Sequence, residues 1–171
     1  DPSRGLGDVY KRQFMIIPSN KFNFKDGLMK SVEVYTNLKN LLKEKGLSVS
    51  VGDEGGFAPN LKTSEEVLDL IILSIERAGL IYLDDMSIAL DCAASELFSE
   101  DSYKLTGENK KFSSDEMVFY VQALVDKYEI KSVEDPFDEK DWDAWKTFTK
   151  NNNDLQIVGD DIFVTQEKIL R

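Results

Sequence analysis

The stretch SIALD, residues 87–91, sets the pattern from which the fold can be predicted. It is a short apolar run that stops on a carboxylate, Asp91, and two later runs repeat this arrangement. These are IKSVE, residues 130–134, and QIVGD, residues 156–160. Amphipathic segments lie between the runs, and this alternation of strand with helix predicts a parallel sheet of βα units. We therefore expect an α/β fold.

Four amphipathic segments predict helices, because their apolar residues recur every three or four positions. Two of the four begin with a capping box, in which Ser or Thr is followed three positions later by Glu. A further apolar run, FMIIP, predicts the end of another buried strand. The helical segments are residues 25–46, 63–79, 113–128 and 141–150, and the additional strand is residues 14–18.

Composition excludes several classes of function. The net charge is −11, from 32 acidic and 21 basic residues, which argues against nucleic acid or an anionic membrane as a partner. The chain has no histidine, so it offers no Ser-His-Asp or Cys-His catalysis and no imidazole for zinc. The single cysteine, Cys92, is expected in the core and fits a reducing, cytoplasmic compartment. Acid–base chemistry must therefore use carboxylates, lysines or tyrosines.

The three predicted strands end on Asp91, Glu134 and Asp160. In a (β/α)8 barrel, catalytic residues lie at the carboxyl ends of the strands, so these acids are expected to meet at one mouth. Three carboxylates without a base would repel one another, and a divalent cation removes that conflict. A ligand set made only of oxygen suits Mg²⁺. The alternative for each acid alone is a turn or a helix cap.

Two other acidic stretches have different interpretations. The acids of residues 135–143 are expected to form a solvated first turn of a helix, where the helix dipole favours them. The stretch VGDEGGFAPN, residues 51–60, holds Asp53 and Glu54 between glycines. Glycine lets a backbone turn closely around a ligand, so this loop is a candidate part of a site.

Four motifs together resemble the enolase family of phosphopyruvate hydratases. They are VGDEGGFAPN, LDCAASELF at residues 90–98, VEDPFDEKDW at residues 133–142 and QIVGDDIFVT at residues 156–165. They follow the order and spacing of the family, and the chain is most similar to the bacterial members. The resemblance implies that residues 14–171 form an incomplete (β/α)8 TIM-type barrel, part of the C-terminal domain of an enolase.

The resemblance also implies a reaction and its residues. Asp91, Glu134 and Asp160 match the family's Mg²⁺ ligands, and Glu134 and Asp160 also lie beside the substrate. Glu54 matches the general acid that assists loss of the 3-hydroxyl from 2-phosphoglycerate, which yields phosphoenolpyruvate in glycolysis. Enolase-superfamily sites use a lysine or histidine base, with Mg²⁺ stabilising an ene-diolate. Family members are homodimers or larger, and they occur in the cytoplasm and also at the cell surface or secreted.

The sequence departs from the family at two places. Gln13 stands where enolases have a glutamate, next to a stretch, residues 1–13, that has no structural periodicity and is expected to be a non-native or disordered tail. The family's base lysine and its histidines match no residue here, since the chain covers roughly 40% of an enolase by family length. The 171-residue chain alone is therefore expected to be inactive. The alternatives are another acid dehydratase of the superfamily and a non-catalytic scaffold.

Overall fold

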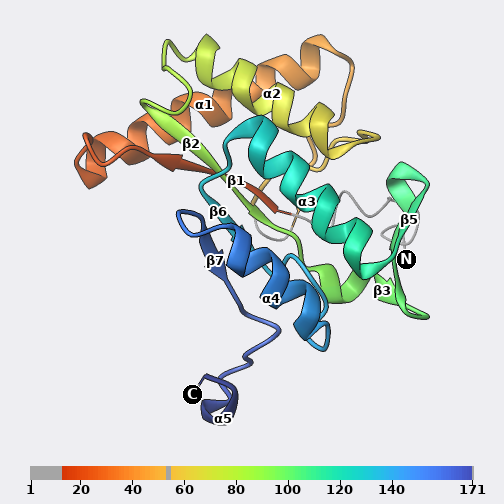
Figure 1. The fold of residues 1–171 in the computed structure, drawn as a ribbon. Coiled ribbons are helices and arrows are strands. Elements are labelled where there is room, and N and C mark those ends of the chain that lie inside the picture. Colours follow the sequence, from red (N-terminus) through yellow and green to blue (C-terminus); the bar gives the residue numbers. More distant parts are fainter. Residues whose placement is uncertain (1–12, 53–54, 171) are drawn as a thin grey trace.

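The computed structural model describes residues 13–52 and 55–170, and these residues form a four-stranded sheet, a smaller three-stranded sheet and their covering helices (Figure 1). The main sheet contains β1 (Gln13–Pro18), β2 (Met86–Asp91), β6 (Ser132–Glu134) and β7 (Gln156–Val158). The helices are α1 (Phe24–Glu44), α2 (Ser64–Arg77), α3 (Ser114–Tyr128), α4 (Trp142–Asn151) and α5 (Glu167–Leu170). The segment between β2 and α3 holds η3 (Ala94–Leu97), β3 (Phe98–Ser99), β4 (Ser102–Leu105), η4 (Thr106–Glu108) and β5 (Lys110–Phe112).

The main sheet has the strand order β1-β2-β6-β7. The pairs β2/β6 and β6/β7 are parallel, which confirms the parallel arrangement predicted for the three runs that carry the acids. In contrast, β1 runs antiparallel to β2, with Gln13 opposite Asp91 and Pro18 opposite Met86. The first residue of β1, and not its last, therefore reaches the edge of the sheet where the other three strands end.

The core lies between the sheet and the helices α2, α3 and α4. In Figure 1, α3 and α4 lie side by side over the sheet, and α1 lies beside α2. Apolar side chains from β2, β6 and these three helices form one cluster; its members include Ile88, Leu90, Val133, Ile71, Ile75, Val121, Leu124, Trp145 and Phe148. Cys92 belongs to this cluster, as expected from the sequence.

The structure confirms the predicted helices, and it differs from the prediction in how one of them is capped. Ser113 and Glu116 form the predicted reciprocal capping box of α3. Thr63 caps α2 by accepting the Glu66 N–H, but the Glu66 carboxylate accepts the N–H of Lys62 instead of closing the box. On α1 the apolar stripe is not fully covered by this chain, since Leu28 and Val32 are 55% and 56% exposed.

Two predictions from the sequence were wrong. The strand predicted to end at Asp160 ends at Val158, and its residues are partly exposed because β7 is an edge strand among the described residues. The acidic run was predicted to be solvated, but Asp135 is only 3% exposed and Asp138 only 8%. Each of these two carboxylates accepts backbone N–H groups, which offsets the loss of hydration. Within residues 13–52 and 55–170, no helix is both long and apolar enough to cross a membrane.

Candidate active site at the carboxyl ends of the strands

Two of the candidate residues, Asp91 and Glu134, share one row across the main sheet with Gln13. Gln13 pairs with Asp91 on the antiparallel side, and Asp91 pairs with Glu134 on the parallel side. Glu134 is in turn opposite Val158, the last residue of β7. Because paired residues point to the same face of a sheet, the Asp91 and Glu134 side chains are neighbours. Asp160 lies two positions beyond the end of β7.

The electrostatics of this row are those of a cluster of like charges. Burial raises the pKa of Asp91 above its usual value, and the nearby charges of Asp135, Asp161 and Asp160 raise it further, although a hydrogen bond from the Ala93 N–H opposes this. Burial likewise raises the pKa of Glu134, followed by the charges of the surrounding carboxylates, of which Asp91 contributes most. Such a cluster attracts a cation.

The donor chemistry fits a hard cation, although the three predicted ligands are not fully assembled. Carboxylate oxygens are the groups that Mg²⁺ prefers. Among residues 13–52 and 55–170, no three acidic, histidine or cysteine side chains lie close enough together to hold a metal ion. Asp91 and Glu134 are adjacent, whereas Asp160 is exposed. The metal site of Asp91, Glu134 and Asp160 therefore stays a prediction.

The pKa shifts of the acids predict a dependence of stability on pH in the metal-free protein. A carboxylate whose pKa is raised by folding stabilises the protein below its unfolded pKa, and this stabilisation is lost as the pH rises through the folded value. For Asp91 the loss begins near pH ~4, its ordinary value. Relative to the parent, Asp91→Asn is therefore expected to gain thermal stability as the pH is raised from about 4 to about 7.

The measurement is the unfolding temperature of both proteins across this range in a chelator. Asp85→Asn serves as a control of opposite sign, because hydrogen bonds from Lys21 and from the Ile81 N–H lower the pKa of Asp85. Its stability relative to the parent should fall as the pH rises from about 2 to about 5 and stay level above that, so this control is measured from a lower starting pH. A difference between parent and Asp91→Asn that does not change with pH would contradict the prediction.

Gly159 directly precedes Asp160, at a position where there is no room for a side chain. A Cβ atom at this position would lie 2.4 Å from the Ile162 Cγ2 and 2.6 Å from the Phe163 Cε2. Ile162 is buried in the main core, so it cannot move aside freely. The turn itself closes through N–H groups of Phe163 and Val164, which donate to the Asp160 carbonyl at 3.1 and 2.9 Å.

Gly159→Ala is expected to lower the free energy of unfolding by about 1–3 kcal/mol, the usual range for overpacking a core. The matched control is Gly56→Ala, because a Cβ atom there meets nothing within 4 Å; its effect should stay within about 0.5 kcal/mol. Urea unfolding of the two variants and the parent measures both values. Equal stabilities of the two variants would show that the turn tolerates the added methyl group.

The candidate general acid, Glu54, lies outside the described residues, as does Asp53. The residues on either side are tied together: the Gly55 N–H donates to the Gly52 carbonyl at 3.0 Å, and the Gly52 N–H donates to the Gly56 carbonyl at 2.9 Å. Gly55 has a φ of +81°, a conformation that glycine adopts without steric cost. Tyr35 of α1 donates from its hydroxyl to the Gly55 carbonyl at 3.1 Å.

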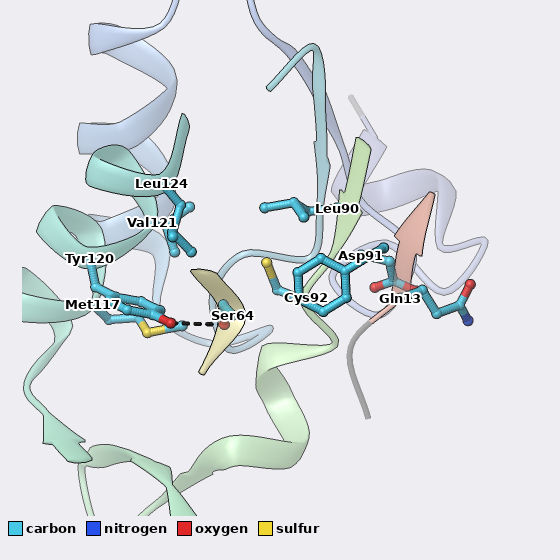
Figure 2. A pocket seen from close by; sticks show the side chains of 10 residues that line it. Gln13, Ser64, Leu90, Asp91, Cys92, Met117, Tyr120, Val121 and Leu124 are labelled. Carbon is cyan, nitrogen blue, oxygen red and sulfur yellow. Dashed lines mark hydrogen bonds between the residues drawn. The ribbon is translucent and has the colours of Figure 1, made fainter. Parts of the chain in front are cut away.

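A small cavity of about 10 Å³ lies between β1, β2 and α3, with room for about one water molecule (Figure 2). Gln13 and Asp91 line one side of it, and Ser64 and Tyr120 line the other. The Tyr120 hydroxyl donates to the Ser64 Oγ at 2.9 Å. Sequence reasoning did not assign a role to Gln13, and only the antiparallel direction of β1 shows that it belongs to the acidic row.

Comparison with known proteins agrees with this arrangement. A family model described as "Enolase, C-terminal TIM barrel domain" matches residues 4–171. Proteins named "Enolase" from three strains of Legionella pneumophila (Corby, Paris and Philadelphia 1) are each 47% identical to this chain over 161 residues. The match covers 94% of this chain and 38% of each relative. The chain therefore belongs to the enolase family and corresponds to part of its C-terminal TIM-barrel domain.

Proposed function

We propose that the complete protein containing this segment is a phosphopyruvate hydratase, which reversibly dehydrates 2-phosphoglycerate to phosphoenolpyruvate in glycolysis. The observation that carries this proposal is the pairing of Asp91 with Glu134 at the carboxyl ends of neighbouring parallel strands. In TIM-barrel enzymes this edge is where catalysis takes place. Membership of the enolase family then selects the reaction.

Asp91, Glu134 and Asp160 are the residues proposed to hold Mg²⁺. When bound, the cation supplies positive charge that stabilises the second negative charge developing on the substrate carboxylate. The chain's own acids cannot supply this charge, because the Asp91 and Glu134 carboxylates are negative when ionised. Burial and the neighbouring acids raise the pKa values of both carboxyl groups, and a bound cation would offset this repulsion between like charges.

Glu54 is proposed to protonate the leaving group. In the dehydration, the proton on carbon 2 of the substrate passes to a base outside this chain, and the bond between carbon 3 and its hydroxyl oxygen breaks. The hydroxyl takes a proton from Glu54 and departs as water. This segment has no histidine, and a protonated glutamic acid can serve as a general acid. Glu134 and Asp160 are proposed to lie beside the substrate and fix its orientation.

The test uses a completed chain, defined as the Legionella pneumophila relative in which the matching 161 residues are replaced by those of this protein. Mg²⁺-dependent formation of phosphoenolpyruvate from 2-phosphoglycerate, followed by ultraviolet absorbance, would support the proposal. The 171-residue chain alone is expected to form none. Turnover of other acid substrates but not of 2-phosphoglycerate would favour a different dehydratase of the superfamily.

Gln13 favours a second candidate, a non-catalytic protein that keeps the fold. A neutral amide occupies a position next to Asp91 where the family resemblance leads us to expect a carboxylate. Calorimetric titration of the completed chain with Mg²⁺ separates the two functions. Binding of Mg²⁺ would retain the enzyme proposal, and an absence of binding would favour the scaffold.

A further inference from the structure

Asp135 follows Glu134 directly and differs from the other acids of the site in being fully enclosed. Only 3% of its surface is exposed. Its backbone has a φ of +40°, a left-handed conformation that is uncommon outside glycine, asparagine and aspartate. A buried, ionisable side chain on such a backbone needs a structural reason, since a buried charge must be hydrogen-bonded.

Both carboxylate oxygens of Asp135 bind the turn that follows β7. Oδ1 accepts the Asp160 N–H at 3.0 Å, and Oδ2 accepts the Asp161 N–H at 2.9 Å. Hydrogen bonds from amides to a carboxylate are shorter and stronger than those between neutral groups. The side chain next to Glu134 therefore holds the backbone of Asp160 itself.

The backbone of Asp135 makes two further hydrogen bonds, one to β7 and one to η3. Its N–H donates to the Val158 carbonyl at 3.1 Å, and its carbonyl accepts the Ala94 N–H at 3.1 Å. The preceding carbonyl, that of Glu134, accepts the Cys92 N–H at 2.9 Å. Residues 134–135 are thus bonded to the segments that follow both Asp91 and Val158.

We propose that Asp135 is a positioning residue, which holds the backbone of the turn at Asp160 beside Glu134, so that the Asp160 side chain can join the Asp91 and Glu134 carboxylates when a cation binds. The inference rests on the proposed function, because it assigns a role within that same site. The position of Asp160 beyond the end of β7 explains why its backbone needs to be held in place. Asp91 and Glu134 are held by the ladder of the sheet, whereas β7 has ended two residues before Asp160.

The decisive substitution is Asp135→Asn in the completed chain. An asparagine keeps the size of the side chain and suits a left-handed backbone, but it has one acceptor oxygen and one NH₂ donor. It can accept only one of the two amides, and its NH₂ group then faces the other N–H. Asp138→Asn is the matched control: Asp138 is also buried and accepts the Lys140 N–H at 2.9 Å, and its recorded hydrogen bonds do not include the turn at Asp160.

Three measurements test the role. Calorimetric titration with Mg²⁺ alone should show that Asp135→Asn weakens affinity by about 10–100-fold, the usual effect of losing a group that orients a metal ligand. In metal-free protein, hydrogen exchange of the Asp160 and Asp161 amides should become faster, with little change elsewhere in the sheet. At saturating Mg²⁺, kcat should recover to within a few-fold of the parent. Asp138→Asn should change none of the three: Mg²⁺ affinity, amide exchange at the turn, or kcat.

The outcomes separate this inference from the function on which it rests. If the parent binds Mg²⁺ and Asp135→Asn binds it equally well, or if the variant loses only thermal stability, then the inference is wrong and the proposed function stands. If the completed parent chain itself binds no Mg²⁺, both are overturned. Amides at Asp160 and Asp161 that exchange equally fast in parent and variant would also refute the positioning role.

Discussion

Replacing Gln13 with Glu in the completed chain is expected to raise kcat for 2-phosphoglycerate dehydration by about 10²-fold or more, within the range of a general acid–base group. Gln13 lies opposite Asp91 at the edge where the strands end, so a carboxylate there joins the acidic row. The added charge also raises the pKa values of acids in the same row, such as Asp91.

The matched control is Gln156→Glu. Gln156 is the first residue of β7, so the same change of charge is made at the opposite end of the parallel strands. Steady-state assays at saturating Mg²⁺ should show a large increase for the first variant and none for the second. Equal activities of parent and Gln13→Glu would mean that a carboxylate at position 13 has no catalytic part in this protein.

Glu134→Gln in the Gln13→Glu background is expected to lower kcat by about 10²–10³-fold, the loss typical of removing one electrostatic stabiliser of a developing charge. The substitution keeps the shape of the side chain but removes its negative charge beside Asp91. It should also weaken Mg²⁺ binding in a titration without substrate.

Glu76→Gln provides the control, because Glu76 is an exposed residue of α2 and should leave both properties unchanged. Unfolding temperatures of the two variants must be compared with the parent. A Glu134→Gln protein that binds Mg²⁺ normally and turns over at the parent rate would remove Glu134 from the site.

Much of the fold could be predicted from the sequence because its signals are local. The apolar runs and the caps at Thr63 and Ser113 depend on neighbours within a few positions, and the structure places strands and helices there. The direction of β1 could not be predicted in this way. A run such as FMIIP has the same periodicity in either direction, and only its pairing with β2 decides between them.

Only part of the candidate site could be predicted from the sequence, for a related reason. Asp91 and Glu134 end their strands as expected, and parallel pairing makes them neighbours. The role of Asp135 could not be predicted, because a buried acid and a solvated one have the same appearance in sequence. Its burial depends on the Asp160 and Asp161 amides, which lie 25 and 26 positions away. The short strands of residues 98–112 also gave no signal, since strands of two to four residues show no clear alternation.

The antiparallel pairing of β1 with β2 has a consequence for folding during synthesis. Gln13 meets Asp91, about 80 residues later in the chain. At a translation rate of roughly 5–20 residues per second, β1 leaves the ribosome about 4–16 s before its partner strand does. During this interval β1 lacks the strand that pairs with it here, and an unpaired apolar strand is prone to aggregation. Chaperone binding to the nascent chain is therefore expected to be strongest before β2 emerges.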